Sequence, residues 1–99
     1  MKILALEKEN PGTLPEQFIP HLKAEAARAW ELYKSGHLRE IYFRQDRKEA
    51  VLVLECMDVE AAHRLLETLP LVQAGLINFE VIPLIPYPGF ERLFNQQLA

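Results

Sequence analysis

Residues 37–56, HLREIYFRQDRKEAVLVLEC, contain the pattern that decides the fold. Residues 37–44 alternate and include β-branched and aromatic side chains, which favours a strand. The polar run 45–48 predicts a hairpin turn. Residues 50–56 are apolar at nearly every position, which is typical of a strand buried on both faces. The stretch therefore predicts an antiparallel hairpin in the middle of the chain.

The segment before this hairpin predicts a strand and a long helix. Residues 3–7 are short, apolar and bounded by charge, as expected of a strand. After a turn at Asn10-Pro11-Gly12, Thr13 is expected to cap a helix that runs to about Lys34. Gly36 then stops the helix.

The segment after the hairpin predicts a second helix and a last strand. Asp58 is expected to cap the helix, and Pro70 to end it. Residues 76–84 predict the fourth strand. The βαββαβ order predicts an α+β, ferredoxin-like domain over residues 1–86, with a four-stranded antiparallel sheet and two helices on one face. Residues 87–99 form a C-terminal tail that we expect to pack on a neighbouring subunit.

Both faces of the predicted sheet are apolar. In the third strand Val51 and Val53 point to one face, and Leu52 and Leu54 point to the other. Two helices cover only one face in this topology, and soluble monomers rarely expose a large apolar patch. The sequence therefore predicts a homodimer or a higher homo-oligomer, with a second copy on the uncovered face.

Composition narrows the partners and the compartment. A net charge of −3 and scattered basic residues argue against nucleic acid as a partner. Cys56 is the only cysteine, so no internal disulfide is expected. No segment approaches the length of a membrane span. We therefore expect a cytoplasmic protein that binds neither nucleic acid nor membranes.

Glu25 is the most unusual residue of the first predicted helix. At about 100° per residue it falls inside the apolar arc, close to Phe18 and Leu32. A carboxylate on such a face is costly unless it is paired or functional, and burial raises its pKa toward the range of a general base. The alternative is a border residue that pairs with His21 or Arg28, or with an arginine on a strand.

Other candidate residues lie around Glu25. Arg39 or Arg44 on the second strand could hold a substrate carboxylate, although either could be a surface charge instead. His21 lies four residues before Glu25, which could form an acid–base couple or half of a metal site. Two ligands do not make a metal site, so none is predicted. Trp30 is typical of a core position.

Several short motifs resemble those of muconolactone isomerases over about residues 20–88. The matching stretches are Leu22-Lys23-Ala24-Glu25, Gly36 with Arg39, Val59-Glu60-Ala61-Ala62-His63, Leu69-Pro70-Leu71, Phe79-Glu80-Val81 and Tyr87-Pro88. The sequence departs from the family in its second strand, where Glu40 replaces a histidine.

The resemblance implies a dimeric α+β barrel that needs no cofactor and moves a proton within a small carboxylated lactone, during aromatic-compound breakdown. Glu25 would then be the base, and Arg39 or Lys23 would hold the substrate carboxylate or an enolate oxygen. The residues expected to contact the substrate are Lys23, His21, Trp30 and Tyr42.

Two other functions fit the same fold class. One is a ligand-binding or assembly module without chemistry, in which Trp30, Tyr33 and Phe43 would fill the space beside Glu25. The other is a cofactor-free monooxygenase of the antibiotic-biosynthesis type, which would place histidine or asparagine beside Trp30. A polar-lined cavity next to Glu25 would favour the isomerase.

Overall fold

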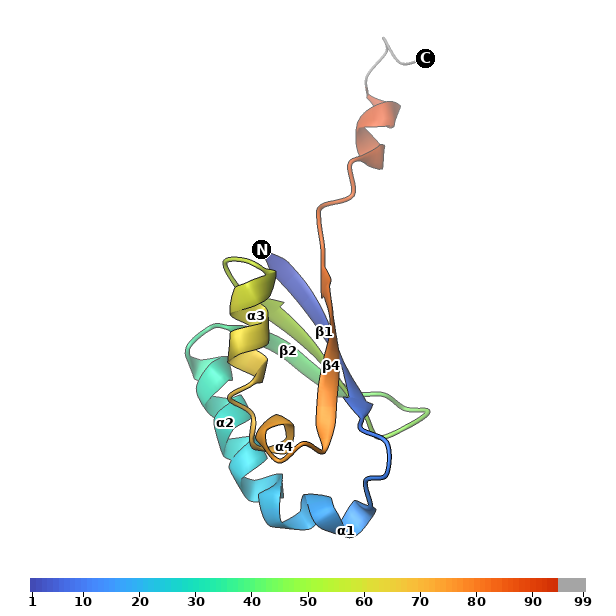
Figure 1. Cartoon of the computed structure of the whole chain (residues 1–99). Coiled ribbons are helices and arrows are strands. Elements are labelled where there is room, and N and C mark those ends of the chain that lie inside the picture. Colours follow the sequence, from blue (N-terminus) through green and yellow to red (C-terminus); the bar gives the residue numbers. More distant parts are fainter. Residues whose placement is uncertain (95–99) are drawn as a thin grey trace.

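The strands form one antiparallel sheet, as the hairpin at the centre of the sequence predicted. The computed structural model describes residues 1–94 and orders the strands β2-β3-β1-β4 (Figure 1). Their bounds are Lys2–Glu9 for β1, Leu38–Phe43 for β2, Ala50–Glu55 for β3 and Ile77–Pro83 for β4. All three neighbouring pairs are antiparallel. The predicted α+β fold class is confirmed.

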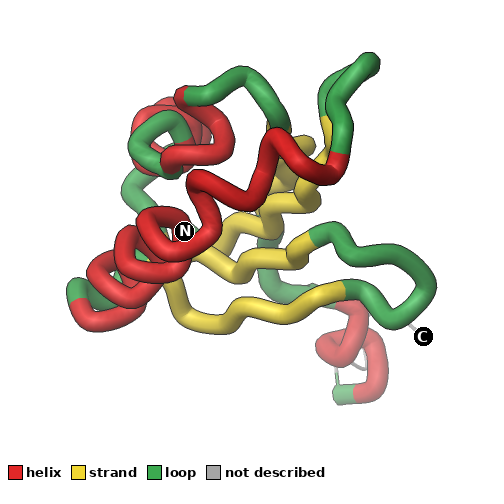
Figure 2. Tube along the Cα trace, turned by 90° about the horizontal axis from the view of Figure 1, so that it is seen from below, coloured by secondary structure: helices red, strands yellow, loops and turns green. Residues whose placement is uncertain are grey.

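The two main helices lie on the same side of this sheet. Helix α2 (Leu22–Lys34) contacts β2, and α3 (Val59–Leu66) contacts β4. Figures 1 and 2 show both helices along one face of the strands. The shorter pieces are α1 (Pro15–Phe18), η1 (Ile19–His21), α4 (Pro70–Gln73) and η2 (Gly89–Leu93).

The first predicted helix is not continuous, and this corrects the sequence prediction. Its residues form α1, a 3₁₀ turn and α2 in succession. Pro20 lies in the 3₁₀ turn and has no backbone N–H to donate to a carbonyl of the preceding turn. The helix cap also differs, because Leu14 N–H donates to Gln17 Oε1 at 2.7 Å and Thr13 gives no cap bond. Figure 1 shows that the chain changes direction between α1 and α2.

The second predicted helix begins as expected and ends earlier. Ala61 N–H donates to Asp58 Oδ1 at 2.7 Å, which confirms Asp58 as the N-cap. The helix ends at Leu66, and Pro70 begins the short helix α4 instead of ending α3. Proline suits that place because the first turn of a helix has no partner for its N–H.

The core lies between the sheet and the helices. Its fully buried members include Ile3, Leu38, Leu54 and Leu69. The opposite face of the sheet has no helix over it among residues 1–94. The apolar side chains on that uncovered face are half-buried: Leu4, Leu6, Val51, Val53 and Ile82. Both apolar faces predicted from the sequence are therefore present.

The chain after β4 extends away from the domain (Figure 1). Tyr87 and Phe90 pack edge to face with ring centroids 5.1 Å apart, and Leu93 and Phe94 remain exposed. Part of the predicted tail, residues 95–99, lies outside the described residues. Its packing on a neighbouring subunit stays a prediction. No helix within residues 1–94 is both long enough and apolar enough to cross a membrane.

Candidate active site

A cavity of about 860 Å³ lies between the sheet and the kinked helical segment. Apolar side chains from η1 and α2, such as Ile19 and Ala29, form one wall. Leu52 and Phe79 come from the sheet, and Leu71 from α4. Ligand pockets of this size hold small organic molecules. The break at Pro20 bends the chain so that α1, η1 and α2 all border the same space.

Glu25 lies in this wall, as its place on the apolar arc predicted. Its carboxylate is half-buried, and Oε1 accepts a hydrogen bond from Leu71 N–H at 2.9 Å. Burial raises the pKa of Glu25, while the Leu71 hydrogen bond and a positive charge on His21 act in the opposite direction. The carboxylate is thus anchored on one oxygen and is more easily protonated than an exposed glutamate.

Arg28 does not pair with Glu25, which argues against the structural ion pair considered for that position. Arg28 Nε donates to Thr68 Oγ1 at 2.9 Å, and its Nη1 lies 3.7 Å from Glu31 Oε2. The partner of the Glu25 carboxylate among the described side chains and backbone is therefore an amide of α4.

Glu7 is a second carboxylate in the wall and is only 8% exposed. Its Oε1 accepts a hydrogen bond from Ala50 N–H at 3.3 Å. Burial raises the pKa of Glu7, and the negative charges of Glu49, Glu25 and Glu9 raise it further, against the Ala50 hydrogen bond. The charge of Glu25 is one of the smaller influences on the pKa of Glu7, after burial, the Ala50 hydrogen bond and Glu49.

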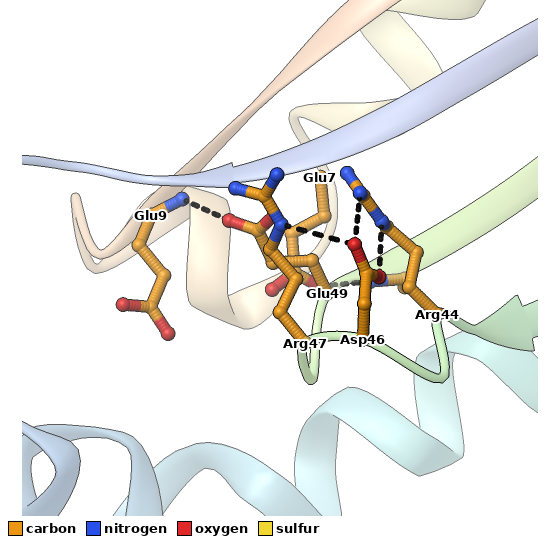
Figure 3. A network of polar contacts seen from close by, with 7 residues as sticks. Glu7, Glu9, Arg44, Asp46, Arg47 and Glu49 are labelled. Atoms are coloured by element: carbon orange, nitrogen blue, oxygen red, sulfur yellow. Dashed lines mark hydrogen bonds and ion pairs between the residues drawn. The ribbon is translucent and has the colours of Figure 1, made fainter.

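The loop between β2 and β3 carries two arginines that form ion pairs with acidic residues of the same loop (Figure 3). Arg44 Nε and Nη2 donate to Asp46 at 2.9 and 2.6 Å. Arg47 Nε lies 3.5 Å from Glu49 Oε1, and Glu49 Oε2 accepts from Glu9 N–H at 3.4 Å. These contacts place the arginines on the loop beside Glu7, outside the cavity wall.

Trp30 and Glu25 are the sequence-predicted site residues that the structure brings together. Trp30 lines the same cavity, is 57% exposed and stacks on Tyr33 with ring centroids 5.6 Å apart. Tyr33 and Phe43 also line the space. These aromatic side chains form a rim for the cavity and do not fill it.

The other predicted site residues lie outside the cavity wall of the described chain: His21, Lys23, Arg39 and Tyr42. Arg39 Nε donates to the Gly36 carbonyl at 2.6 Å, at a register shift in β2. Tyr42 is opposite Val51 on the uncovered face and donates to Glu40 at 2.6 Å. The roles given to these residues stay predictions.

Sequence reasoning missed Glu7, although a signal for it was present. Ile3, Ala5 and Glu7 alternate along β1, and the first two are fully buried on the helix side. Continuing that period of two residues places Glu7 on the same inner face. The signal is weak because a charged residue at the expected end of a strand also marks the boundary of that strand.

Replacing Glu7 with glutamine should stabilise the protein at neutral pH. A carboxyl with a raised pKa binds its proton more tightly in the folded state, so stability falls as pH rises through that pKa. Glutamine keeps an acceptor for Ala50 N–H and carries no charge. We expect Tm to rise by about 4 °C near pH 8, with a gain that shrinks toward pH 4.

Thermal melts of both proteins across this pH range measure the effect. Glu60→Gln is the matched control, because Glu60 is exposed on α3 away from the cavity. A Glu7→Gln protein that melts below wild type near pH 8 would show that the ionised carboxylate stabilises the fold.

The fold and the cavity together define a class: a small α+β protein with an apolar cavity whose wall carries carboxylates. A statistical model of the family described as muconolactone delta-isomerase matches residues 5–89. That match covers most of the chain, so the protein belongs to the muconolactone delta-isomerase family.

Two solved structures have the same fold. A crystal structure of muconolactone isomerase superposes with a TM-score of 0.73 at 23% identity, over 89% of this chain and 92% of that one. The second is the 5-chloro-2-hydroxyhydroquinone dehydrochlorinase from Burkholderia phenoliruptrix AC1100, in complex with 2,5-dihydroxybenzoquinone. It superposes with a TM-score of 0.71 at 20% identity, over 90% of this chain and 98% of that one. A comparison with curated proteins finds no match.

Proposed function

We propose that this protein is a cofactor-free isomerase that moves a proton within a small unsaturated ring compound, with Glu25 as the base. One observation carries the proposal: a half-buried carboxylate with a raised pKa lies in the wall of an apolar cavity large enough for such a ring. A base of this kind removes protons most effectively when its pKa approaches the working pH.

The reaction needs no electron acceptor. The Glu25 carboxylate takes a proton from the ring carbon that is joined to a carbonyl group through a carbon–carbon double bond. The C–H electron pair forms a new carbon–carbon double bond, and the original double bond shifts toward the carbonyl carbon. The carbonyl π electrons move to oxygen and give an enolate. The protonated Glu25 then returns the proton to a different ring carbon, which shifts the double bond and restores the carboxylate. Product and substrate have the same composition.

Glu7 has the properties to assist this step. Burial and three neighbouring carboxylates favour its protonated form, which can donate a hydrogen bond. A donor aimed at the developing enolate oxygen stabilises the transition state. We assign to Glu7 the role of hydrogen-bond donor to the enolate oxygen. Arg39 could hold an anionic group only if its side chain reached the cavity of its own subunit or that of another subunit.

Family membership supports enzymatic chemistry over a pure assembly role. The two similar structures are named as a dehydrochlorinase and an isomerase, and both names are those of enzymes. The binding-module alternative expected Trp30, Tyr33 and Phe43 to fill the space, whereas they line it. The oxygenase alternative expected histidine or asparagine beside Trp30, and none lies in the described wall.

The pH dependence of kcat/KM tests the two carboxyl roles. Activity should rise as Glu25 loses its proton and fall as Glu7 loses its own, giving a bell-shaped profile. The midpoints of the rising and falling limbs should both lie at a pH above the usual glutamate pKa of about 4.3. A positive charge on His21 lowers the pKa of Glu25. The negative charges of Glu49, Glu25 and Glu9 raise the pKa of Glu7.

Initial rates of muconolactone isomerisation, and of its uncharged methyl ester, give this profile by loss of ultraviolet absorbance. Deuterium uptake from heavy water into the ring, followed by NMR, reports proton removal independently. A profile without a rising limb above the usual glutamate pKa would contradict the role of Glu25 as base.

We also propose that the protein assembles through the uncovered sheet face, with itself as partner. Half-buried Leu4, Leu6 and Val53 lie on that face, and no described segment covers them. A second sheet packed against it would remove these side chains from water. A cytoplasmic location stays a prediction.

A further inference from the structure

We infer that the cavity takes an uncharged ring compound with a hydroxyl group, and discriminates against analogues that carry a carboxylate. This inference rests on the proposed function, because it names the substrate class of the same site. It also departs from the resemblance, which implied a carboxylated substrate.

The charges of the wall carry the inference. Glu7, Glu9 and Glu25 line the cavity, and Lys48 is the single cation among the described residues of the wall. Lys48 Nζ lies 5.9 Å from the centroid of the Phe43 ring, at the rim formed by β2 and its loop. An anionic ligand would therefore meet more carboxylates than cations.

The arginines near the cavity already have partners among the described residues. Arg44 is bound to Asp46, Arg47 lies between Asp46 and Glu49, and Arg39 donates to a backbone carbonyl. A ligand carboxylate that loses water in this space would gain no described arginine, and an unpaired buried charge is costly. If Glu7 and Glu25 are ionised they repel it, and if they are protonated they still supply no compensating positive charge.

An uncharged hydroxylated ring fits the same wall. Its faces can pack against aromatic side chains such as Phe18, Trp30 and Phe79. Its hydroxyl can donate to the Glu25 carboxylate, while a protonated Glu7 can donate to an oxygen of the ring compound. Both carboxyls keep one oxygen on a backbone N–H, which leaves the second oxygen of each without a described hydrogen bond and able to meet a ligand.

Three ligands with the same phenol ring test the inference: methyl 4-hydroxybenzoate, which is uncharged, 4-hydroxybenzoate, an anion, and tyramine, a cation. Trp30 is the only tryptophan and lines the cavity, so its fluorescence reports binding, with calorimetry as the second measurement. At about pH 7.5 we expect the uncharged ester to bind at least about tenfold more tightly than the anion.

Variants assign the preference to the wall. Glu25→Gln and Glu7→Gln should each narrow the ratio of ester to anion affinity, whereas Glu60→Gln makes the same change in net charge on α3 and should leave the ratio unchanged. Equal or tighter binding of the anion overturns the inference. Tightest binding of tyramine, or no binding of any of the three ligands, overturns it as well.

The outcome is separable from that of the proposed function. Selective binding of uncharged ligands without any proton exchange would support the preference for uncharged ligands and contradict the isomerase activity. Efficient turnover of anionic muconolactone, together with poor turnover of its methyl ester, would support the isomerase activity and contradict the preference for uncharged ligands.

Discussion

We expect Glu25→Gln to lower kcat/KM for proton transfer by about 10²–10⁴-fold, the range that a positioned general base contributes. Glutamine has nearly the same size, and its amide oxygen can still accept the hydrogen bond that Leu71 N–H gives to Glu25 Oε1. It cannot take up a proton at any relevant pH. The variant therefore removes the base and leaves the cavity in place.

Stability separates this expectation from a structural role for the same carboxylate. Breaking a buried ion pair would leave a cation unpaired and lower Tm. The carboxylate accepts from a backbone amide, and Arg28 bonds elsewhere, so we expect Tm to stay the same or rise. Thermal melts and proton-transfer rates of wild type, Glu25→Gln and the Glu60→Gln control distinguish a catalytic role of Glu25 from a structural one. Full activity in Glu25→Gln would remove it from the chemistry.

The sequence predicted Glu25 because a helix has a regular period and one apolar side. Counting residues placed the carboxylate on the inner arc without knowledge of the sheet. Glu7 follows an equally regular period along β1, but strands are short and their ends are hard to place, so the sequence alone gives no orientation for a charged residue at the expected end of the strand. The interruption at Pro20 was also readable, since proline in a helix interior carries a known cost.

The position of Arg39 could not be read in the same way. A simple alternation puts Arg39, Ile41 and Phe43 on one face. In the structure a register shift between Leu38 and Glu40 breaks that alternation, so that Ile41 and Phe43 line the cavity and Arg39 does not. A bulge depends on how β2 pairs with β3, which is a property of two strands and not of one.

The same shift decides which residues lie on the uncovered face of the sheet. Glu40 and Tyr42 lie opposite Val53 and Val51, on the side without helices. Tyr42 was predicted to contact substrate, and its register places it among the residues available for assembly. The polar atoms of this pair satisfy each other, because Tyr42 Oη donates to Glu40 Oε1. An aromatic side chain with its polar end satisfied suits a protein interface.

We expect Val53→Asp to raise the dissociation constant of the proposed assembly by at least about 100-fold, because it would put an unpaired carboxylate into an apolar contact. Val53 is half-buried in β3 and opposite Leu4 of β1, near the middle of the uncovered face. Its side chain points away from the helices, so the change leaves the core of the single chain intact.

Sedimentation over a range of concentrations measures the effect. Wild type should sediment as a dimer or a multiple of it at micromolar concentration, and Val53→Asp should approach the monomer mass of 11.4 kDa. Ala24→Asp is the matched control, because it adds the same charge at an exposed position in the first turn of α2, where an acid is well tolerated. A wild-type protein that is a stable monomer would contradict the proposed use of this face, since its apolar side chains would then have no partner.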